Sequence, residues 1–400
     1  FPNVDDSDKI EKFKTLLEEA AMEWELEIYL DEVIATLESE GKIQDEGLNN
    51  APPKIIYKDT PSTLLLIDGE PKIEKNDDLN MDIVVNTPFL IVKNPDDKKF
   101  YLFGGDYWYV SNNVTSSWTP AGALKGTMKD LDKALREQME ENGQTETEGE
   151  KPSSPPEIVV STEPAELIQS NGEADFNAIE GTSLLYMTNS DNDILMDIES
   201  QNYYVLLSGR WYTSKSLTGT WTYTDADKLP ADFAKIPTGS DKDGVLASVA
   251  GTPEAKEAKM DAQIPQTAKV DRNSTDCTVE YDGKPKFEPI EGTSLYLAMN
   301  TSSTVIRSNN KYFAVENGVW FVSNNAEGPW EVSTERPKDV ENIPASSPAY
   351  NTKYVYVYDV TPQYVYMGYT PGYLGCYVHG PTVVYGTGFY YRPWYGSYYY

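Results

Sequence analysis

The first forty residues carry apolar side chains at the spacing of a helix. Between Ile10 and Trp24 these positions recur every three or four residues, which gathers them in one stripe. A second short helix is expected from Asp31, and Gly41 is a suitable stop because glycine readily adopts the left-handed conformation that ends helices. We therefore predict a small helical N-terminal segment over residues 1–50.

After a Pro-containing junction the pattern changes to short apolar runs rich in Val, Ile and Tyr, separated by Gly, Asn, Asp and Ser. Asp68-Gly69 and Asp282-Gly283 stand between such runs and are hairpin signals, because both turn positions need a positive φ angle. The fold class is therefore mainly β, with three repeated antiparallel β modules and short connecting helices. The predicted modules span residues 54–139, 157–237 and 269–344.

The spacing of tryptophan indicates that the modules are copies of one unit. Six of the eight tryptophans form three pairs, and the members of each pair are ten positions apart. A rare residue does not acquire such spacing by chance, so each pair marks one repeat. We expect the two indoles of a pair to lie on one face of a hairpin and to form the structural core of the repeat. The pairs are Trp108 with Trp118, Trp211 with Trp221, and Trp320 with Trp330.

The connecting segments differ in composition from the modules. Helical spacing over 126–139 predicts a helix that trails the first module, and a short helix is expected within the linker 238–268. Residues 140–156 lack core-forming side chains and are typical of a flexible linker. The length of that linker favours separate modules over the blades of one propeller, because blades are joined by short connections. The pattern itself is compatible with both arrangements.

Residues 345–400 form a Gly/Tyr-rich tail, which we expect to be β. From Asn351 to Tyr400 only Lys353, Asp359 and Arg392 are charged, whereas the whole chain carries a formal charge of −31. Two interpretations stay open. The tyrosines of neighbouring hairpins can cover one another, or they can form a surface for self-association, since electrostatic repulsion is least there.

Charge and composition exclude several classes of function. The acidity argues against nucleic acid, whose phosphates need clustered Lys and Arg, and against anionic lipid. No apolar run is long enough for a transmembrane helix, so we expect no membrane insertion. Two cysteines and one histidine are too few for a Cys/His zinc site, and His379 has no nucleophile motif near it. We therefore expect no catalytic residues, no metal and no cofactor. Whether Cys277 and Cys376 pair is left open.

The aromatic residues beside the tryptophans are the candidate binding residues. Neighbouring side chains of a strand point to opposite faces, so these residues would be exposed if each first tryptophan points inward. An exposed aromatic platform can stack on a sugar ring or contact a protein partner. The candidates in the modules are Tyr107, Tyr109, Tyr212 and Phe321, and those in the tail are Tyr369, Tyr373 and Trp394.

Several stretches of the chain resemble one family of large bacterial secreted or envelope proteins, labelled carbohydrate-binding family V/XII. The most specific are LLLIDGEPKI, YYVLLSGRWYTS, VYDVTPQYVYMGYTPGYLGCYV and GPTVVYGTGFYYRPWYG. The resemblance covers nearly the whole chain. It implies an extracellular or cell-envelope location and a β-repeat architecture, and it brings no established catalytic residues.

We therefore expect a non-catalytic structural or interaction protein. It would contribute to a surface assembly or filament through aromatic β contacts, with further copies of itself or other surface proteins as partners. The alternative is an array of carbohydrate-binding modules that holds a polysaccharide on exposed Tyr and Trp platforms.

Overall fold

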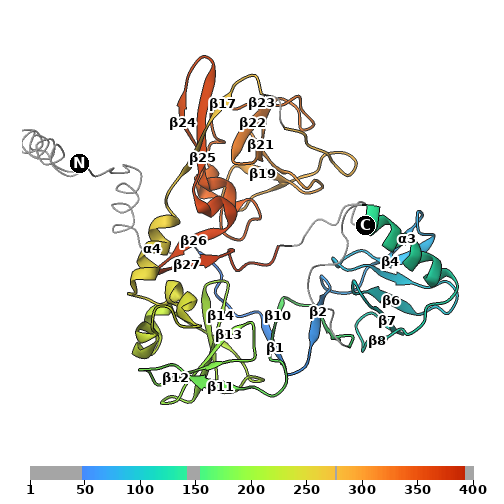
Figure 1. Ribbon diagram of the computed structural model, residues 1–400. Helices are drawn as coiled ribbons and strands as arrows, with labels where there is room; N and C mark the ends of the chain where they lie inside the picture. Colours follow the sequence, from blue (N-terminus) through green and yellow to red (C-terminus); the bar gives the residue numbers. More distant parts are fainter. Residues whose placement is uncertain (1–46, 142–153, 275–276, 392–400) are drawn as a thin grey trace, which may run out of the picture.

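The computed structural model describes residues 47–141, 154–274 and 277–391 (Figure 1). It is mainly β, with several antiparallel sheets and few helices. The predicted helical segment lies outside the described residues except for residues 47–50, and so does Trp394. Most of the predicted linker 140–156 also falls outside them.

Three of the sheets have six strands each, and in all three every strand pairs antiparallel with the next one along the chain. The first contains β3 (Ile73–Asn76), β4 (Met81–Val84), β5 (Ile91–Lys93), β6 (Phe100–Phe103), β7 (Trp108–Ser111) and β8 (Thr119–Pro120). The second contains β11 (Phe176–Ala178), β12 (Leu184–Met187), β13 (Asp193–Asp197), β14 (Asn202–Leu207), β15 (Arg210–Ser214) and β16 (Thr222–Thr224). The third contains β18 (Phe287–Pro289), β19 (Leu295–Ala298), β20 (Thr304–Ser308), β21 (Lys311–Glu316), β22 (Val319–Ser323) and β23 (Glu331–Val332).

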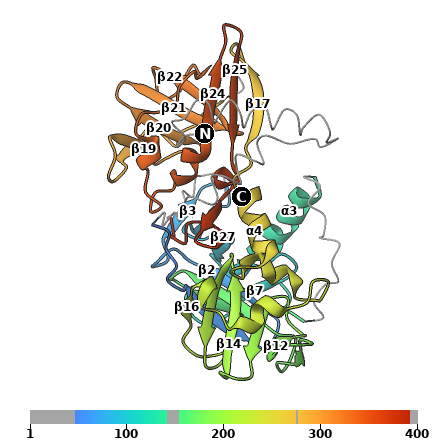
Figure 2. The same ribbon diagram turned by 90° about the vertical axis from the view of Figure 1, so that its left-hand side faces the viewer.

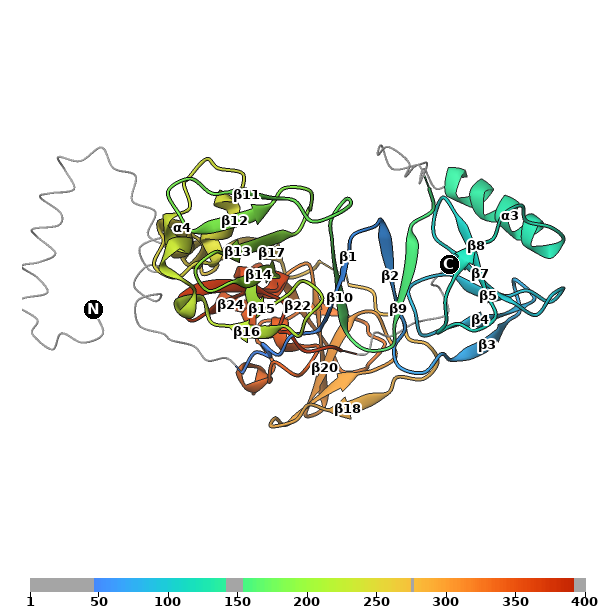
Figure 3. The ribbon, with the colours of Figure 1, turned by 90° about the horizontal axis from the view of Figure 1, so that it is seen from below.

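Two short parallel pairs join the first and second sheets, and the sequence did not predict them. The pairs are β1 (Lys54–Lys58) with β10 (Ala165–Gln169), and β2 (Ser62–Leu66) with β9 (Glu157–Ser161). Figure 3 shows both pairs between the two sheets. Parallel strands need a long crossover, and here the whole first sheet forms that connection. Hairpin signals in the sequence cannot indicate pairing over such a distance.

The tail forms two further sheets. A three-stranded sheet has the order β17 (Gln266–Asp271), β25 (Tyr364–Tyr369), β24 (Val355–Val360), and a hairpin joins β26 (Cys376–His379) to β27 (Thr382–Tyr385). β17 straddles the predicted boundary between residues 268 and 269, and it pairs with a tail strand far along the chain. We call the sheet of β17, β25 and β24 the tail sheet.

The helices cover the sheets and are short. Both helices expected between the modules are present, as α3 (Thr127–Glu141) and α4 (Pro253–Asp261). The Thr252 hydroxyl accepts from the Ala255 N–H and caps α4. The other helices within the described ranges are 3-10 turns: η1 (Ala226–Lys228), η2 (Ala231–Lys235), η3 (Asp243–Ser248), η4 (Val340–Asn342), η5 (Tyr350–Tyr354) and η6 (Pro371–Leu374).

Each of the first two six-stranded sheets is covered on both faces. In the first, Trp108 packs with Met128 and Leu131 of α3, while Tyr109 and Trp118 lie in a separate cluster with residues of β2 and β9. In the second, one face packs on η2 and η3 and the other packs on β1 and β10. The core is therefore divided into clusters on either side of each sheet.

The prediction that both indoles of a pair share one face is wrong. Tyr109 pairs with Pro120 and Val110 with Thr119, so Trp118 falls opposite Ser111, three positions after Trp108. Side chains an odd number of positions apart in a strand point to opposite faces. The second and third sheets have the same register, since Tyr212 pairs with Tyr223 and Phe321 with Val332.

In each six-stranded sheet an asparagine just after the second strand bonds to the turn that leads into the first strand. In the third sheet the Asn300 amide donates to the carbonyls of Asp282 (2.7 Å) and Lys284 (3.0 Å), and its Oδ1 accepts from the Lys286 N–H (2.8 Å). Asn86 and Asn189 make the same three bonds at the same sequence separations. One side chain thus satisfies three backbone groups of a glycine-containing turn.

We expect Asn300→Ala to lower the free energy of unfolding by about 3 kcal/mol, because three partly buried hydrogen bonds to the backbone are lost at once. Asn189→Ala is the matched comparison. Asn189 is half-buried, whereas Asn300 is buried. Water can therefore replace more of the hydrogen bonds lost in Asn189→Ala, and that variant should be less destabilised than Asn300→Ala. Urea unfolding followed by tryptophan fluorescence measures both variants, and equal effects would contradict this account.

The second sheet, the chain before β1 and the C-terminal strap (residues 385–391) meet at Arg210. Among the described residues Arg210 is the only buried cation. Its guanidinium donates to Asn50 Oδ1 and to the carbonyls of Tyr385 and Gly386, each at 2.9 Å. Asn49 adds bonds to the carbonyls of Thr387 (2.8 Å) and Gly388 (2.9 Å). The two ends of the described chain are therefore joined to each other.

Candidate interaction site

The tail sheet packs one face on the third six-stranded sheet (Figure 2). Val355, Val365 and Met367 point to this inner face and are fully buried. The indole N–H of Trp320 donates to the Val355 carbonyl at 3.0 Å, which fixes β24 to the sheet below. The alternate positions of the same strands must face away from the core.

The outer face of the tail sheet is aromatic. Tyr356 pairs with Gly368, which has no side chain to cover the ring, and Tyr366 lies between Asp359 and Lys269 in one row across the three strands. Tyr358 is 48% exposed and Tyr366 is 36% exposed. We call Tyr356, Tyr358, Tyr364 and Tyr366 the outer tyrosines.

Cations lie against these rings. Lys269 Nζ is 3.8 Å from the ring centre of Tyr364, and the Arg336 guanidinium carbon is 4.8 Å from that of Tyr356. A cation over the negative face of an aromatic ring is attracted to it, which holds the ring in place. Burial raises the pKa of both Tyr356 and Tyr358 above the ordinary tyrosine value. Tyrosine hydroxyls are protonated near neutral pH in any case and can donate hydrogen bonds.

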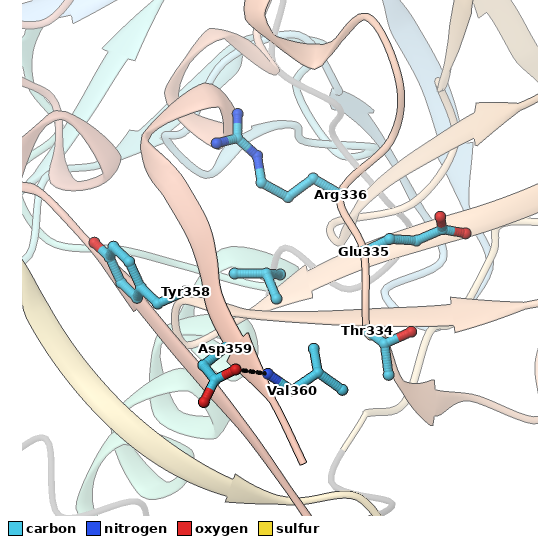
Figure 4. A pocket seen from close by; sticks show the side chains of 7 residues that line it. Thr334, Glu335, Arg336, Tyr358, Asp359 and Val360 are labelled. Carbon is cyan, nitrogen blue, oxygen red and sulfur yellow. Dashed lines mark hydrogen bonds between the residues drawn. The ribbon is translucent and has the colours of Figure 1, made fainter. Parts of the chain in front are cut away.

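A groove of about 410 Å³ runs beside β24 (Figure 4). Its lining residues are Thr334, Glu335, Arg336, Val357, Tyr358, Asp359 and Val360. Figure 4 shows Glu335 and Arg336 on one segment and Tyr358 on the facing strand, with its ring turned away from Glu335. Carboxylate, guanidinium and hydroxyl groups thus line the groove, and the exposed Tyr358 ring lies at its margin, a combination that suits a ligand with both hydroxyl groups and an apolar face.

Three of the predicted platform residues are in the wrong place for that role. Tyr109, Tyr212 and Phe321 are 2%, 3% and 3% exposed. They do point away from the first tryptophan of each pair, as expected, but that second face is covered as well. Tyr107 is half-buried and packs on the cluster that contains Tyr109 and Trp118. The prediction that these residues and the first tryptophans lie on opposite faces of the strand is confirmed, but the prediction that the second face is open to solvent is wrong.

The predicted tail residues support the fold. Tyr369 and Tyr373 are half-buried with ring centres 5.1 Å apart, and the Tyr369 hydroxyl donates to Gln266 Oε1 at 3.0 Å. A Cβ on Gly318 would collide with the Tyr369 ring. All six paired tryptophans are buried, at 7% exposure or less.

Sequence reasoning did not select the outer tyrosines. A signal was present, because Tyr and Val alternate over residues 354–358 and alternation in a strand separates two faces. Arg336 had no comparable signal, since it reaches Tyr356 only through the packing of the tail on the third sheet.

Both cysteines are free thiols in the structure, and burial raises the pKa of Cys277 to about 11. The described residues contain no group of three or more His, Cys, Asp or Glu side chains placed to hold a metal ion. None of the helices in the described ranges has the length and apolar character needed to cross a membrane. No protein-family model matches the chain, and no curated protein matches it in sequence.

Proposed function

We propose that this chain is a non-catalytic structural or interaction protein of the bacterial exterior, which contacts other chains through the outer tyrosines. The observation that carries the proposal is the solvent-exposed aromatic face of the tail sheet. Tyr358 and Tyr366 are exposed in a region where only three residues of the last fifty are charged. Exposed apolar patches rimmed by polar groups are typical of interaction sites.

We infer that the three six-stranded sheets are copies of one module. Two features support this inference. In every sheet the residue that pairs with the first tryptophan lies three positions after the second tryptophan. Each sheet also has the same asparagine-bonded turn. Repeated modules in series are suited to hold a contact surface at a distance from an anchor point.

Self-association through the outer tyrosines is tested by the mass of the purified chain as a function of concentration. We expect the wild-type chain to form dimers or larger species. The variant Tyr358→Ser with Tyr366→Ser should raise the dissociation constant about tenfold, since both changes remove exposed aromatic area. Sedimentation equilibrium measures the masses.

The matched control is Tyr385→Ser. Tyr385 is 56% exposed, but it belongs to β27 and lies outside the outer face. It should leave association unchanged. A wild-type chain that stays monomeric at every concentration would contradict the proposal.

A carbohydrate-binding role is the second candidate, and the groove beside β24 favours it. Glu335, Arg336 and Asp359 can bond sugar hydroxyls while the Tyr358 ring covers an apolar sugar face. In pull-downs with insoluble polysaccharides, Tyr358→Ala should then abolish binding. Binding that survives this change would remove the groove from consideration.

A further inference from the structure

The tail sheet has two edges, and β17 forms the open one. Its six residues pair with β25 without any irregularity, and no strand of the described chain pairs with its other side. Figure 2 shows β17 at the margin of the tail sheet. All of its residues except the half-buried Val270 are exposed. An exposed, regular edge presents backbone groups that another strand can pair with.

The opposite edge, on β24, is closed to such pairing. A bulge between Val357 and Asp359 interrupts its register. The Val355 carbonyl already accepts from Trp320, and the Val360 N–H donates to its neighbour Asp359 at 2.9 Å. Bulges and occupied backbone groups are common ways to protect an edge strand. β17 has no bulge. On its open side the Asp271 carbonyl, at the end of the strand, accepts from the Ser274 N–H at 3.0 Å and keeps a second lone pair for a partner strand.

The charges of β17 are self-complementary. Lys269 and Asp271 flank Val270 and point to the same face, because they are two positions apart. A single lysine in an edge strand normally discourages pairing. If two copies of β17 run antiparallel with Val270 opposite Val270, however, Lys269 of each copy lies beside Asp271 of the other. Such an arrangement has two-fold symmetry, in which each contact occurs twice.

The backbone has the matching orientation. The Arg272 N–H donates to the Gln363 carbonyl at 3.0 Å, toward the β25 side. Backbone groups alternate in direction along a strand, so Asp271 and Lys269 direct their N–H groups toward the open side. In the register above these two residues face each other and form a hydrogen-bonded pair. Charge and backbone geometry therefore select the same alignment.

We propose that two copies of this chain pair through their β17 edges, antiparallel about Val270, with reciprocal Lys269–Asp271 ion pairs. This inference rests on the proposed function and adds a contact at the edge of the same sheet, beside the outer tyrosines. The two tail sheets become one six-stranded sheet, in the order β24-β25-β17-β17-β25-β24. The outer tyrosines of both copies then lie on one continuous face. Residues 266–272 carry a net charge of +1, so the contact avoids the repulsion of the acidic chain.

Charge reversal tests this register. A dimer of Lys269→Asp would bring four acidic side chains together, and a dimer of Asp271→Lys would bring four basic side chains together. The dissociation constant of each variant alone should therefore rise tenfold or more. An equimolar mixture of the two variants should recover dimers, because every contact between unlike chains again joins opposite charges. Sedimentation velocity of each variant and of the mixture gives the result.

Lys129→Asp is the matched control, since it makes the same charge reversal at an exposed position of α3, outside the tail sheet. It should leave the dimer unchanged. If wild-type chains associate but the two β17 variants behave like wild type, the β17 contact is wrong and self-association through another surface stands. If wild-type chains never associate, the proposed function itself is wrong.

Discussion

Trp320→Ala is expected to lower the free energy of unfolding by about 4 kcal/mol, the cost of removing a buried aromatic side chain from a packed core. Trp320 is fully buried, and its ring meets that of Phe313 edge to face at 6.4 Å. Its backbone N–H contacts Met367 Sδ, and its indole N–H holds the Val355 carbonyl. The loss should therefore also loosen the tail sheet.

Hydrogen exchange separates the two effects. We expect β24 and β25 to lose protection in Trp320→Ala and to lose much less in Trp320→Phe, which keeps most of the packing. Trp108→Ala is the matched control, since Trp108 occupies the same place in the first sheet and packs on α3. It should destabilise the first sheet and leave the tail protected. Loss of protection in the tail of that control would argue against a local role for Trp320.

Arg210→Ala should cost about 3 kcal/mol, because three hydrogen bonds from a buried charged group are lost at once. We expect the C-terminal strap to separate from the second sheet and become sensitive to protease. Arg210→Lys should behave similarly, since one ammonium cannot reproduce the forked geometry of a guanidinium. Limited proteolysis followed by mass spectrometry identifies where the chain is cut.

Gly388→Ala approaches the same joint from the other side. Gly388 has a φ angle of 75°, and a Cβ there would collide with the Asn49 carbonyl. This variant should release the strap while Arg210 is intact. Lys133→Ala, which removes an exposed ion pair with Glu137, is the control and should change stability by less than about 0.5 kcal/mol. A strap that stays protected in both Arg210→Ala and Gly388→Ala would refute the joint.

The sequence predicted what depends on neighbours along the chain. The β class, the hairpin between each pair of tryptophans and the helices at α3 and α4 follow from local periodicity. The face of the second indole does not, because it depends on the register of the hairpin. The signal for the asparagine-bonded turns was present, since Asn86, Asn189 and Asn300 follow their turns at equal separations.

Contacts between distant segments had no local signal. β17 pairs with a strand almost a hundred residues later, and β1 pairs with β10 across the entire first sheet. Tyr109, Tyr212 and Phe321 are buried for the same reason, because segments from outside the hairpins cover the face of the sheet on which they lie. In the sequence Arg210 follows a Ser-Gly turn and has no distinguishing signal. Its contacts with the C-terminal strap depend on the tertiary fold.

The contacts between Asn49 and the C-terminal strap can form only late in synthesis. A ribosome delivers residues 47–50 early, and their partners Thr387 and Gly388 emerge more than three hundred residues later. The first two sheets can form while the chain is still growing, but the ring of contacts through Arg210 closes only when the strap has left the ribosome. Until then the Arg210 guanidinium keeps its bond to Asn50 and lacks its two bonds to the carbonyls of Tyr385 and Gly386.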